Sequence, residues 1–300
     1  MKETCVNRVK QAIHWKDAYA TGLTGKGVGV AVLDTGICPH KDFDNRIIGF
    51  ADMIGGRRTP YDDCGHGSHI CGIIGGSGCV SDGRYQGMAP GCNLVAVKGL
   101  DWRGNGYASD VLAGIAWVLE QKERLGIRIM NISVGSRGKK RLSETSALVR
   151  GVNAAWDAGL VVVVAAGNNG PNRMSISTPG ISRKVITVGC SDDQTEVMVG
   201  GNRMVNYSGR GPTEACICKP DVVAPGSRVV SCGHGDRYSI KSGTSMSTPV
   251  VSGAVALLLE KYPRMTNLDV KLKLMKSCRD LGLPRNQQGW GLLDVERLLE

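Results

Sequence analysis

Residues 242–249 read SGTSMSTP, and an apolar run follows directly at 250–259, interrupted only by Ser252 and Gly253. Small hydroxyl residues before a long apolar run predict a loop that leads into the first turn of a buried helix. A serine hydroxyl there lies beside unpaired backbone N–H groups, where the helix dipole favours negative charge. That environment suits a nucleophile whose attack creates an oxyanion. A Ser/Thr-rich helix cap without any chemistry has the same pattern, so the rest of the chain must decide between the two.

The chain before this stretch alternates between short apolar runs and segments with helical spacing. Runs typical of buried strands lie at 28–33, 94–97, 128–133, 160–166, 185–188 and 222–224, and helical spacing marks 109–125 and 143–158. Strands that alternate with helices in this way are typical of a parallel sheet with right-handed crossovers. The sequence therefore predicts an α/β fold: a single three-layer domain whose central, mostly parallel sheet carries helices on both faces.

The length of the chain suits one large core. It has 300 residues, of which 42% are hydrophobic, and no internal repeat or shift in composition marks a second domain. Residues 1–24 are interpreted as an N-terminal extension with a short helix over 1–20, whose apolar face comes from Val9, Ala12 and Ile13. Residues 25–300 are expected to form the one main domain.

Three polar side chains lie where this fold places functional sites. Asp34 ends the first predicted strand, Asn168 follows the fourth, and His66 starts a small-residue helix between two glycines. The carboxyl ends of parallel strands form the edge of the sheet where sites are built. Together with Ser245, these residues are the parts of a catalytic triad and an oxyanion donor. Taken alone, Asp34 could equally cap the next turn.

A second histidine follows one helical turn after His66. A metal pair of His66 and His69 is conceivable, but no third ligand stands at a suitable spacing, so His69 is interpreted as a packing or hydrogen-bonding residue. Asp62, four residues before His66, is interpreted as part of a solvated acidic loop, although it could favour a basic substrate residue at a neighbouring subsite.

The formal charge is +10, from 37 Lys+Arg against 27 Asp+Glu, and the densest basic cluster lies at 137–141. A basic surface can bind nucleic acid, but no aromatic interleaving or nucleic-acid motif accompanies it. The charge could instead steer acidic peptides towards a cleft. No apolar run reaches 18 residues. We therefore expect peptide or protein partners, with no nucleic acid and no membrane, and the sequence leaves the oligomeric state open.

Eleven cysteines and a polar N-terminus bear on location. An odd number argues against a complete disulfide framework, and the first residues lack the apolar stretch and cleavage site of a secretory signal. We therefore expect reduced thiols and a cytoplasmic location. Cys216 and Cys218 are too closely spaced for a zinc knuckle, and no second pair answers them, so no metal site is expected.

Five stretches, taken in order, resemble the motif blocks of the subtilisin-like serine proteases. They are VAVLDTGI (30–37), GHGSHICGIIGG (65–76), NISVGS (131–136), VVAAGNNG (163–170) and SGTSMSTPVVSGAVALL (242–258). The resemblance runs from about residue 25 to residue 294 and implies a serine endopeptidase. It implies that Ser245 is the nucleophile, that His66 is the general base and then the acid, and that Asp34 orients the imidazole. The side chain of Asn168 and the backbone N–H of Ser245 would form the oxyanion hole.

The resemblance also implies a cleft that binds the substrate as an added strand. Its substrate-binding residues are expected to be Leu100, Gly104, Gly106, Ser133, Val134, Gly135, Ala166 and Gly167. Small residues in these walls leave room for a large apolar side chain before the scissile bond. Ser177 and Asn169 are expected near the base of this pocket, with no fixed charge to select Lys or Arg.

Calcium is the cofactor to consider in this family, although none is expected to be required. The tight calcium loop of secreted members is not recognisable at 75–85, and Asp42 matches only one of its ligands. The glycine-rich segment 75–87 looks closer to intracellular and related bacterial branches. Three thiols lie near the catalytic motifs, Cys38, Cys64 and Cys71, and burial as small hydrophobic residues is their expected role.

Two questions about function stay open at this point. A non-catalytic scaffold with the same fold is the alternative from a different class, and loss of a triad residue would be its signature, but none is lost here. Within the protease interpretation, both general turnover and dedicated processing of an acidic precursor or leader peptide are compatible with the sequence.

Overall fold

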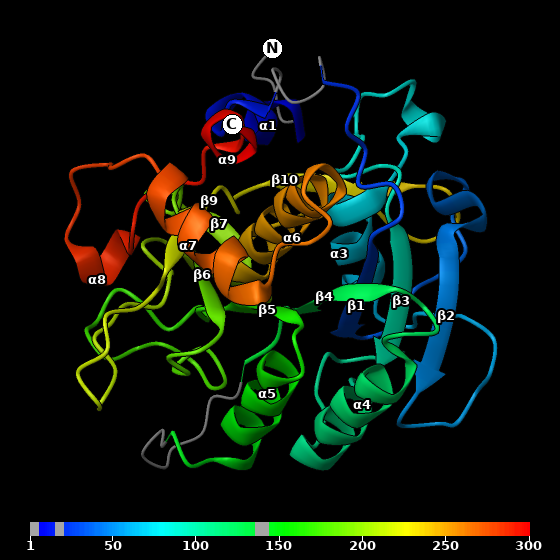
Figure 1. Cartoon of the computed structure of the whole chain (residues 1–300), viewed down its shortest axis with the longest axis horizontal. Coiled ribbons are helices and arrows are strands. Elements are labelled where there is room, and N and C mark those ends of the chain that lie inside the picture. Colours follow the sequence, from blue (N-terminus) through cyan, green and yellow to red (C-terminus); the bar gives the residue numbers. More distant parts are fainter. Residues whose placement is uncertain (1–5, 16–20, 136–143) are drawn as a thin grey trace.

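The computed structural model describes residues 6–15, 21–135 and 144–300, and Figure 1 shows a central sheet between two layers of helices. The basic cluster at 137–141 lies outside the described residues. No helix within the described residues is long and apolar enough to cross a membrane.

Seven strands form the central sheet, in the order β2-β3-β1-β4-β5-β6-β9. They are β1 (Gly29–Asp34), β2 (Ile47–Asp52), β3 (Asn93–Lys98), β4 (Ile127–Ile132), β5 (Val161–Ala165), β6 (Ile186–Cys190) and β9 (Val222–Ala224). Each neighbouring pair runs parallel, which confirms the predicted sheet. β1 and β5 are buried along their whole length, as expected of apolar runs that helices cover on both faces.

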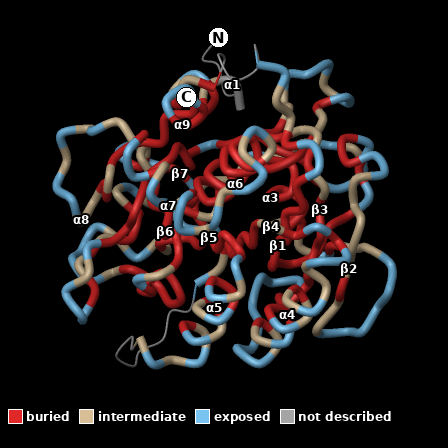
Figure 2. The backbone as a smooth tube through the Cα atoms, in the orientation of Figure 1, coloured by how far each residue is buried: buried red, intermediate tan, exposed pale blue. Residues whose placement is uncertain are grey.

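Two helices cover each face of the sheet. α3 (His66–Gly75) and α6 (Thr244–Lys261) lie on one side, and α4 (Ala108–Gln121) and α5 (Ala147–Asp157) lie on the other (Figure 1). α6 is buried on every side and packs on β4, β5, β6 and α3. Figure 2 shows the buried backbone concentrated in the sheet and around this helix. The stretch at 242–249 therefore leads into the helix around which the core is built.

Smaller elements complete the described structure. They are α1 (Val6–Ala12), α7 (Asn267–Ser277), α8 (Arg285–Gln288), α9 (Val295–Leu299) and the 3₁₀ helices η1 (Lys41–Arg46) and η2 (Cys79–Ser81). α7 begins with a capping box, in which Thr266 and Asp269 satisfy each other's backbone N–H groups.

Two antiparallel hairpins stand outside the alternation of strands and helices that the sequence predicts. They pair β7 (Val197–Val199) with β8 (Asn202–Met204), and β10 (Val229–Cys232) with β11 (Tyr238–Lys241). β8 and β11 contain no continuous apolar run, which was the signal that identified the strands of the central sheet. The turn residues Gly200 and Gly201, both at positive φ, were the available signal for the first hairpin.

The predicted helices are longer than those in the structure. α4 ends at Gln121, four residues before the predicted end, because the chain turns at Gly126 (φ 59°) into β4. α5 begins at Ala147, where the Ser146 hydroxyl accepts a hydrogen bond from the backbone N–H of Val149. Of the predicted helix over 1–20, the structure describes residues 6–15. There α1 covers seven residues, and His14 beyond it takes a positive φ of 54°.

The described part of the N-terminal segment is built into the main core. Val9, Ile13 and Trp15 are buried in the same hydrophobic cluster as the sheet. The backbone N–H of Val295 donates to the carbonyl of Ile13 at 2.8 Å, which places α1 beside α9 (Figure 1). Residues 6–15 are therefore packed as part of the domain.

Candidate active site

Asp34 ends β1 with its side chain buried. Its Oδ1 accepts hydrogen bonds from Nδ1 of His66 at 2.7 Å and from the backbone N–H of Thr35 at 2.8 Å. Because a carboxylate only accepts hydrogen bonds, Nδ1 of His66 carries the proton and Nε2 is left as the basic nitrogen. The end of the strand therefore fixes both the position and the tautomer of the imidazole.

Glycines let α3 start close enough to Asp34 for this contact. Gly65 caps the helix with a φ of 79°, a conformation that costs other residues steric strain. A Cβ atom on Gly67 would lie 2.1 Å from the carbonyl oxygen of Gly36. The GHG pattern around His66 is thus explained by backbone geometry at the turn after β1.

Opposing effects act on the pKa of His66. Burial lowers it, but the charge of Asp34 and the hydrogen bond to it outweigh burial, so the pKa is raised above 6.5. The positive charge of Lys241 acts in the opposite direction and lowers it. The side chain keeps 24% of its surface exposed, so its free nitrogen is accessible from the cavity beside it.

Ser245 lies in the first turn of α6, two residues after the cap Gly243, whose φ is 144°. Its hydroxyl donates to the carbonyl of Ser133 at 2.7 Å. Within the described residues, no hydrogen bond joins Ser245 to His66, although both line one cavity of about 490 Å³. In structures without substrate, such catalytic hydrogen bonds are often absent or long.

Asn168 follows β5, with its amide held in one orientation. Its Oδ1 accepts from the backbone N–H of Thr244 at 2.9 Å and from the Thr244 hydroxyl at 3.0 Å. These two donors occupy the carbonyl end of the amide, so the NH₂ group is left for the cavity that Asn168 lines. The amide of Asn168 and the backbone of Ser245 thus border the same space.

The eight expected substrate residues divide into three groups. Five of them, Leu100, Gly104, Ser133, Val134 and Gly135, line the cavity that holds His66 and Ser245. Gly106 lines an adjoining cavity of about 620 Å³, which shares Leu100, Gly104, Val134 and Gly135 with the first.

Ala166 and Gly167 are found in the linings of neither cavity, and Ala166 is fully buried. Ser177 packs against Gly135 and Gly167, since added Cβ atoms there would lie 2.7 Å and 1.9 Å from its side chain. Asn169 donates to the Ser177 hydroxyl at 2.8 Å. This side of the cleft is therefore backed by neutral groups.

Asp62 is not in a solvated loop, so that expectation was wrong. Only 5% of it is exposed, and its carboxylate accepts from the backbone N–H groups of Cys64, Gly65 and Ser68 and from two hydroxyls. Burial raises its pKa, but these hydrogen bonds, led by those of Ser68, bring it below the usual range. A buried carboxylate that holds the start of α3 has no free oxygen to select a basic substrate residue.

The His69 side chain reaches the β10–β11 hairpin. Its Nε2 donates to the carbonyls of Val229 and Ser239, both at 3.1 Å. Burial lowers the pKa of His69 to about 3, so it is neutral at physiological pH. His69 is therefore a hydrogen-bonding residue, as the sequence indicated.

Residues that the sequence did not indicate also line the cavity that holds His66 and Ser245. They include Met198, Gly200, Ile240 and Lys241, all of them from the two hairpins. Arg103 also lines it, from the segment 100–106 that was expected to border the cleft. Met198 and Ile240 are 55% and 60% exposed, so they offer apolar surface at the cleft. Neither Arg103 nor Lys241 forms an ion pair with a described residue. Short hairpin strands carry no sequence signal that would place these side chains here.

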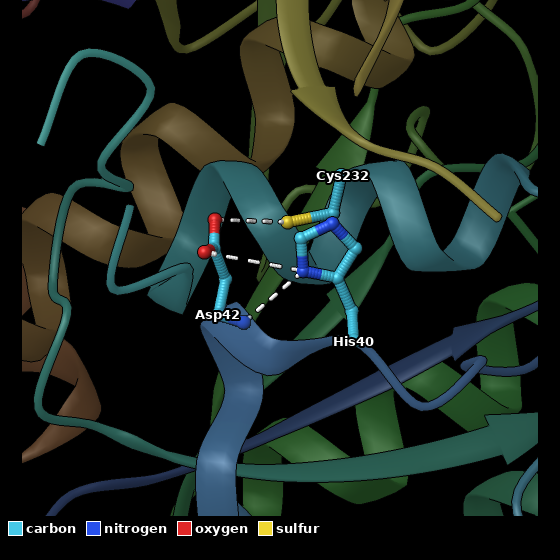
Figure 3. A group of neighbouring side chains, drawn as sticks. All are labelled: His40, Asp42 and Cys232. Carbon is cyan, nitrogen blue, oxygen red and sulfur yellow. Dashed lines mark hydrogen bonds and ion pairs between the residues drawn. The ribbon is translucent and has the colours of Figure 1, made fainter. Parts of the chain in front are cut away.

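Asp42 belongs to a buried cluster with His40 and Cys232 (Figure 3). His40 Nδ1 accepts from the backbone N–H of Asp42 at 3.1 Å, and the Asp42 carboxylate accepts from Tyr238 at 2.8 Å and from Cys232 at 3.6 Å. Calcium takes six to eight oxygen ligands. A nitrogen and a sulfur beside one carboxylate do not fit calcium, and the hydrogen bonds account for the cluster.

The ten described cysteines are all unpaired, and Cys5 lies outside the described residues. Cys38 and Cys71 are buried, and burial raises the pKa of both thiols. Cys64 is half-buried and lines the cavity that also holds His66 and Ser245. Of these three thiols, Cys64 is the one that lines the cavity.

Comparison with known proteins gives matches over nearly the whole chain. The model of the subtilase family matches residues 25–291. Serine protease AprX of Bacillus subtilis (strain 168) is 42% identical over 290 residues, which cover 90% of this chain and 65% of that protein. Subtilisin Savinase of Lederbergia lenta is 36% identical over 279 residues, covering 93% of each.

A solved structure extends the similarity to the fold. The crystal structure of a cold adapted subtilisin-like serine proteinase superposes with a TM-score of 0.74 at 29% identity, covering 91% of this chain and 90% of that one. The motif blocks, the parallel sheet and the matched length agree. The chain belongs to the subtilase family of serine endopeptidases.

Proposed function

We propose that the protein hydrolyses internal peptide bonds with Ser245 as nucleophile, His66 as base and Asp34 as its orienting carboxylate. The observation that carries this proposal is the 2.7 Å hydrogen bond between Asp34 and His66 beside the cavity that Ser245 and Asn168 also line. A scaffold protein would have no need of a buried carboxylate that fixes the tautomer of a partly exposed imidazole.

The reaction begins with a rotation of the Ser245 hydroxyl. A substrate strand along 133–135 would donate a backbone N–H to the Ser133 carbonyl, which now accepts from Ser245. The released hydroxyl then turns towards Nε2 of His66. The oxygen attacks the scissile carbonyl carbon, its proton moves to Nε2, and Asp34 stabilises the resulting imidazolium. His66 next gives that proton to the leaving amine, and water repeats the sequence on the acyl-enzyme.

The oxyanion is stabilised from two directions. The NH₂ group of Asn168 and the backbone N–H of Ser245 border the position at which the carbonyl oxygen becomes negative. Thr244 fixes the Asn168 amide before substrate arrives, so little reorganisation is needed during the reaction.

Turnover of a peptide substrate by Ser245→Ala tests this function. The variant should keep the fold and lose nearly all activity, leaving about 10³–10⁴ over the uncatalysed rate from binding and the oxyanion hole. Ser247→Ala is the matched control, because Ser247 is buried in the same helical turn. Activity of Ser245→Ala within tenfold of the parent would refute the assignment.

The pocket before the scissile bond is proposed to take large apolar residues. Small residues at 133–135 and the neutral pair Ser177 and Asn169 support this, because these described groups behind the wall carry no charge. Peptides that differ only at this position test it: Phe or Leu should be cleaved with a higher kcat/KM than Lys or Asp. A preference for Lys would contradict the proposal.

We propose dedicated processing of acidic peptides because positively charged side chains line the cleft. Lys241 and Arg103 line the cavity on separate segments, and neither has an ion-pair partner among the described residues. Unpaired cations in a cleft raise the local concentration of anionic ligands, and the effect falls with ionic strength. Lys241→Glu should therefore reverse a preference for Glu over Lys after the scissile bond. Equal cleavage of both peptides by the parent enzyme would exclude this role for Lys241.

We propose a reducing, cytoplasmic working environment and no cofactor. The unpaired cysteines support the first, since such thiols persist where glutathione and thioredoxin keep them reduced. The mixed nitrogen, sulfur and carboxylate cluster at Asp42 supports the second, since it does not suit calcium. Activity should survive EDTA, and a loss that calcium restores would contradict the second proposal.

A further inference from the structure

The N-terminal helix α1 carries an arginine with two directed contacts. Arg8 donates from NH1 to the Asp192 carboxylate at 2.7 Å and from NH2 to the carbonyl of Ser227 at 2.6 Å. A planar guanidinium that makes two bonds fixes orientation as well as charge. The helix is thereby tied to the loop 225–228, which joins β9 to β10.

Asp192 connects the same arginine to the backbone of that loop. Its Oδ2 receives the bond from Arg8, and its Oδ1 accepts from the N–H groups of Gly226 at 2.7 Å and Ser227 at 3.0 Å. The Ser227 hydroxyl donates to the Asp192 carbonyl at 2.6 Å. The carboxylate therefore transmits the position of Arg8 to two consecutive peptide groups.

The loop in turn holds the residues before Ser245. The N–H of Gly243 donates to the carbonyl of Gly226 at 3.0 Å, and the N–H of Arg228 donates to the Ser242 hydroxyl at 2.9 Å. A Cβ atom on Gly226 would lie 2.7 Å from the carbonyl oxygen of Gly243. Such close backbone packing passes a displacement of the loop to the start of α6.

The first turn of α6 is thus held on two sides. Asn168 holds the N–H of Thr244 from within the site, and Gly226 holds Gly243 from outside it. We propose that Arg8 is a positioning residue for Ser245, acting through Asp192 and the loop 225–228. This inference rests on the proposed function, because it takes Ser245 to be the nucleophile. Arg8 lies outside residues 25–291, the region that matches the family.

Arg8 is expected to affect turnover more than substrate binding. The cleft segments around Leu100 and Val134 follow β3 and β4, at a different part of the sheet from the loop 225–228. Since a displacement of about 1 Å at a reacting group can cost 10²-fold in rate, partial loosening should lower kcat by roughly tenfold. KM should stay within about twofold.

A double-mutant cycle on kcat and KM tests the connection. Arg8→Met and Asp192→Asn should each lower kcat by roughly tenfold. The double variant should have a kcat no lower than either single variant, because both substitutions break the same hydrogen-bonded connection to the loop 225–228. Arg8→Lys should recover part of the loss. Lys10→Met on the same helix is the control and should leave kcat unchanged. An unchanged kcat in Arg8→Met, or fully additive losses in the double variant, would overturn the proposal.

The variants are expected to fold, because Val9 and Ile13 keep α1 in the core independently of Arg8. Amide hydrogen exchange over 242–247, measured in a Ser245→Ala background, gives a readout that does not depend on activity. Faster exchange in Arg8→Met than in Lys10→Met supports the connection even if the parent enzyme cleaves no peptide. Equal exchange in the two variants contradicts it, whatever the outcome for the proposed function.

Discussion

At the scale of single residues, the chemistry of the site depends on which polar atoms already have a hydrogen-bond partner. The carbonyl end of Asn168 is held by Thr244, so its NH₂ group remains for charge that develops in the transition state. Asn168→Leu should therefore lower kcat by about 10²–10³ and change KM little. Steady-state kinetics on one peptide substrate check this. A higher KM with unchanged kcat would make Asn168 a binding residue instead.

The pKa of His66 sets the acid limb of activity. Burial alone would lower this pKa, but Asp34 raises it by a larger amount, so the pKa lies above 6.5. The base must be neutral, so kcat/KM should fall as the pH drops through a value above 6.5. Because Lys241 lowers the pKa of His66, Lys241→Met should move that limb to higher pH. A limb that stays in place or moves to lower pH would show that the two charges do not interact.

The positions of polar residues at strand ends were predictable, whereas the burial of the Asp62 carboxylate was not. Asp34 and Asn168 follow apolar runs whose length and composition identify strands, so the sequence placed them at one edge of the sheet. Asp62 has the same chemistry, but its burial comes from the start of α3 folding back over it. Nothing in the local sequence distinguishes that from an exposed acidic loop.

At the scale of elements, α6 was predictable and the hairpins were not. The apolar run after residue 249 is long enough to identify a buried helix, which the structure confirms. β10 owes its position to contacts with α3 and α1, which lie far away in sequence, and β11 pairs with β10. Lys241 therefore enters the cleft through tertiary packing, and only the structure identifies it.

Helix α1 carries a buried charge that should make stability depend on pH. Burial lowers the pKa of Lys10 from 10.5 to about 7. Between those values the unfolded chain binds a proton that the folded chain lacks, so this residue makes stability rise with pH across that window. Lys10→Met should therefore raise the melting temperature at pH 7, with a smaller gain at pH 10. Melting curves at the two pH values measure this, and an equal gain at both would contradict it.

At the scale of the whole molecule, most of the described buried apolar residues belong to one large hydrophobic cluster. The main hydrophobic cluster extends from Val9 on α1 to Leu299 on α9 and includes buried thiols such as Cys71 and Cys92. Since no disulfide joins the described cysteines, dithiothreitol should leave the melting temperature and activity unchanged. A lower melting temperature in reductant would show that disulfides form in solution, and the proposed reducing environment would be wrong.

In the proposed reaction Ser245 and His66 act as one nucleophilic unit, although no hydrogen bond joins them in this structure. Peptide mapping after reaction with a fluorophosphonate tests it most directly. We predict one adduct, on Ser245, in the parent enzyme, and almost none in His66→Ala under the same conditions. An adduct on another residue, or equal labelling of Ser245 without His66, would contradict the account.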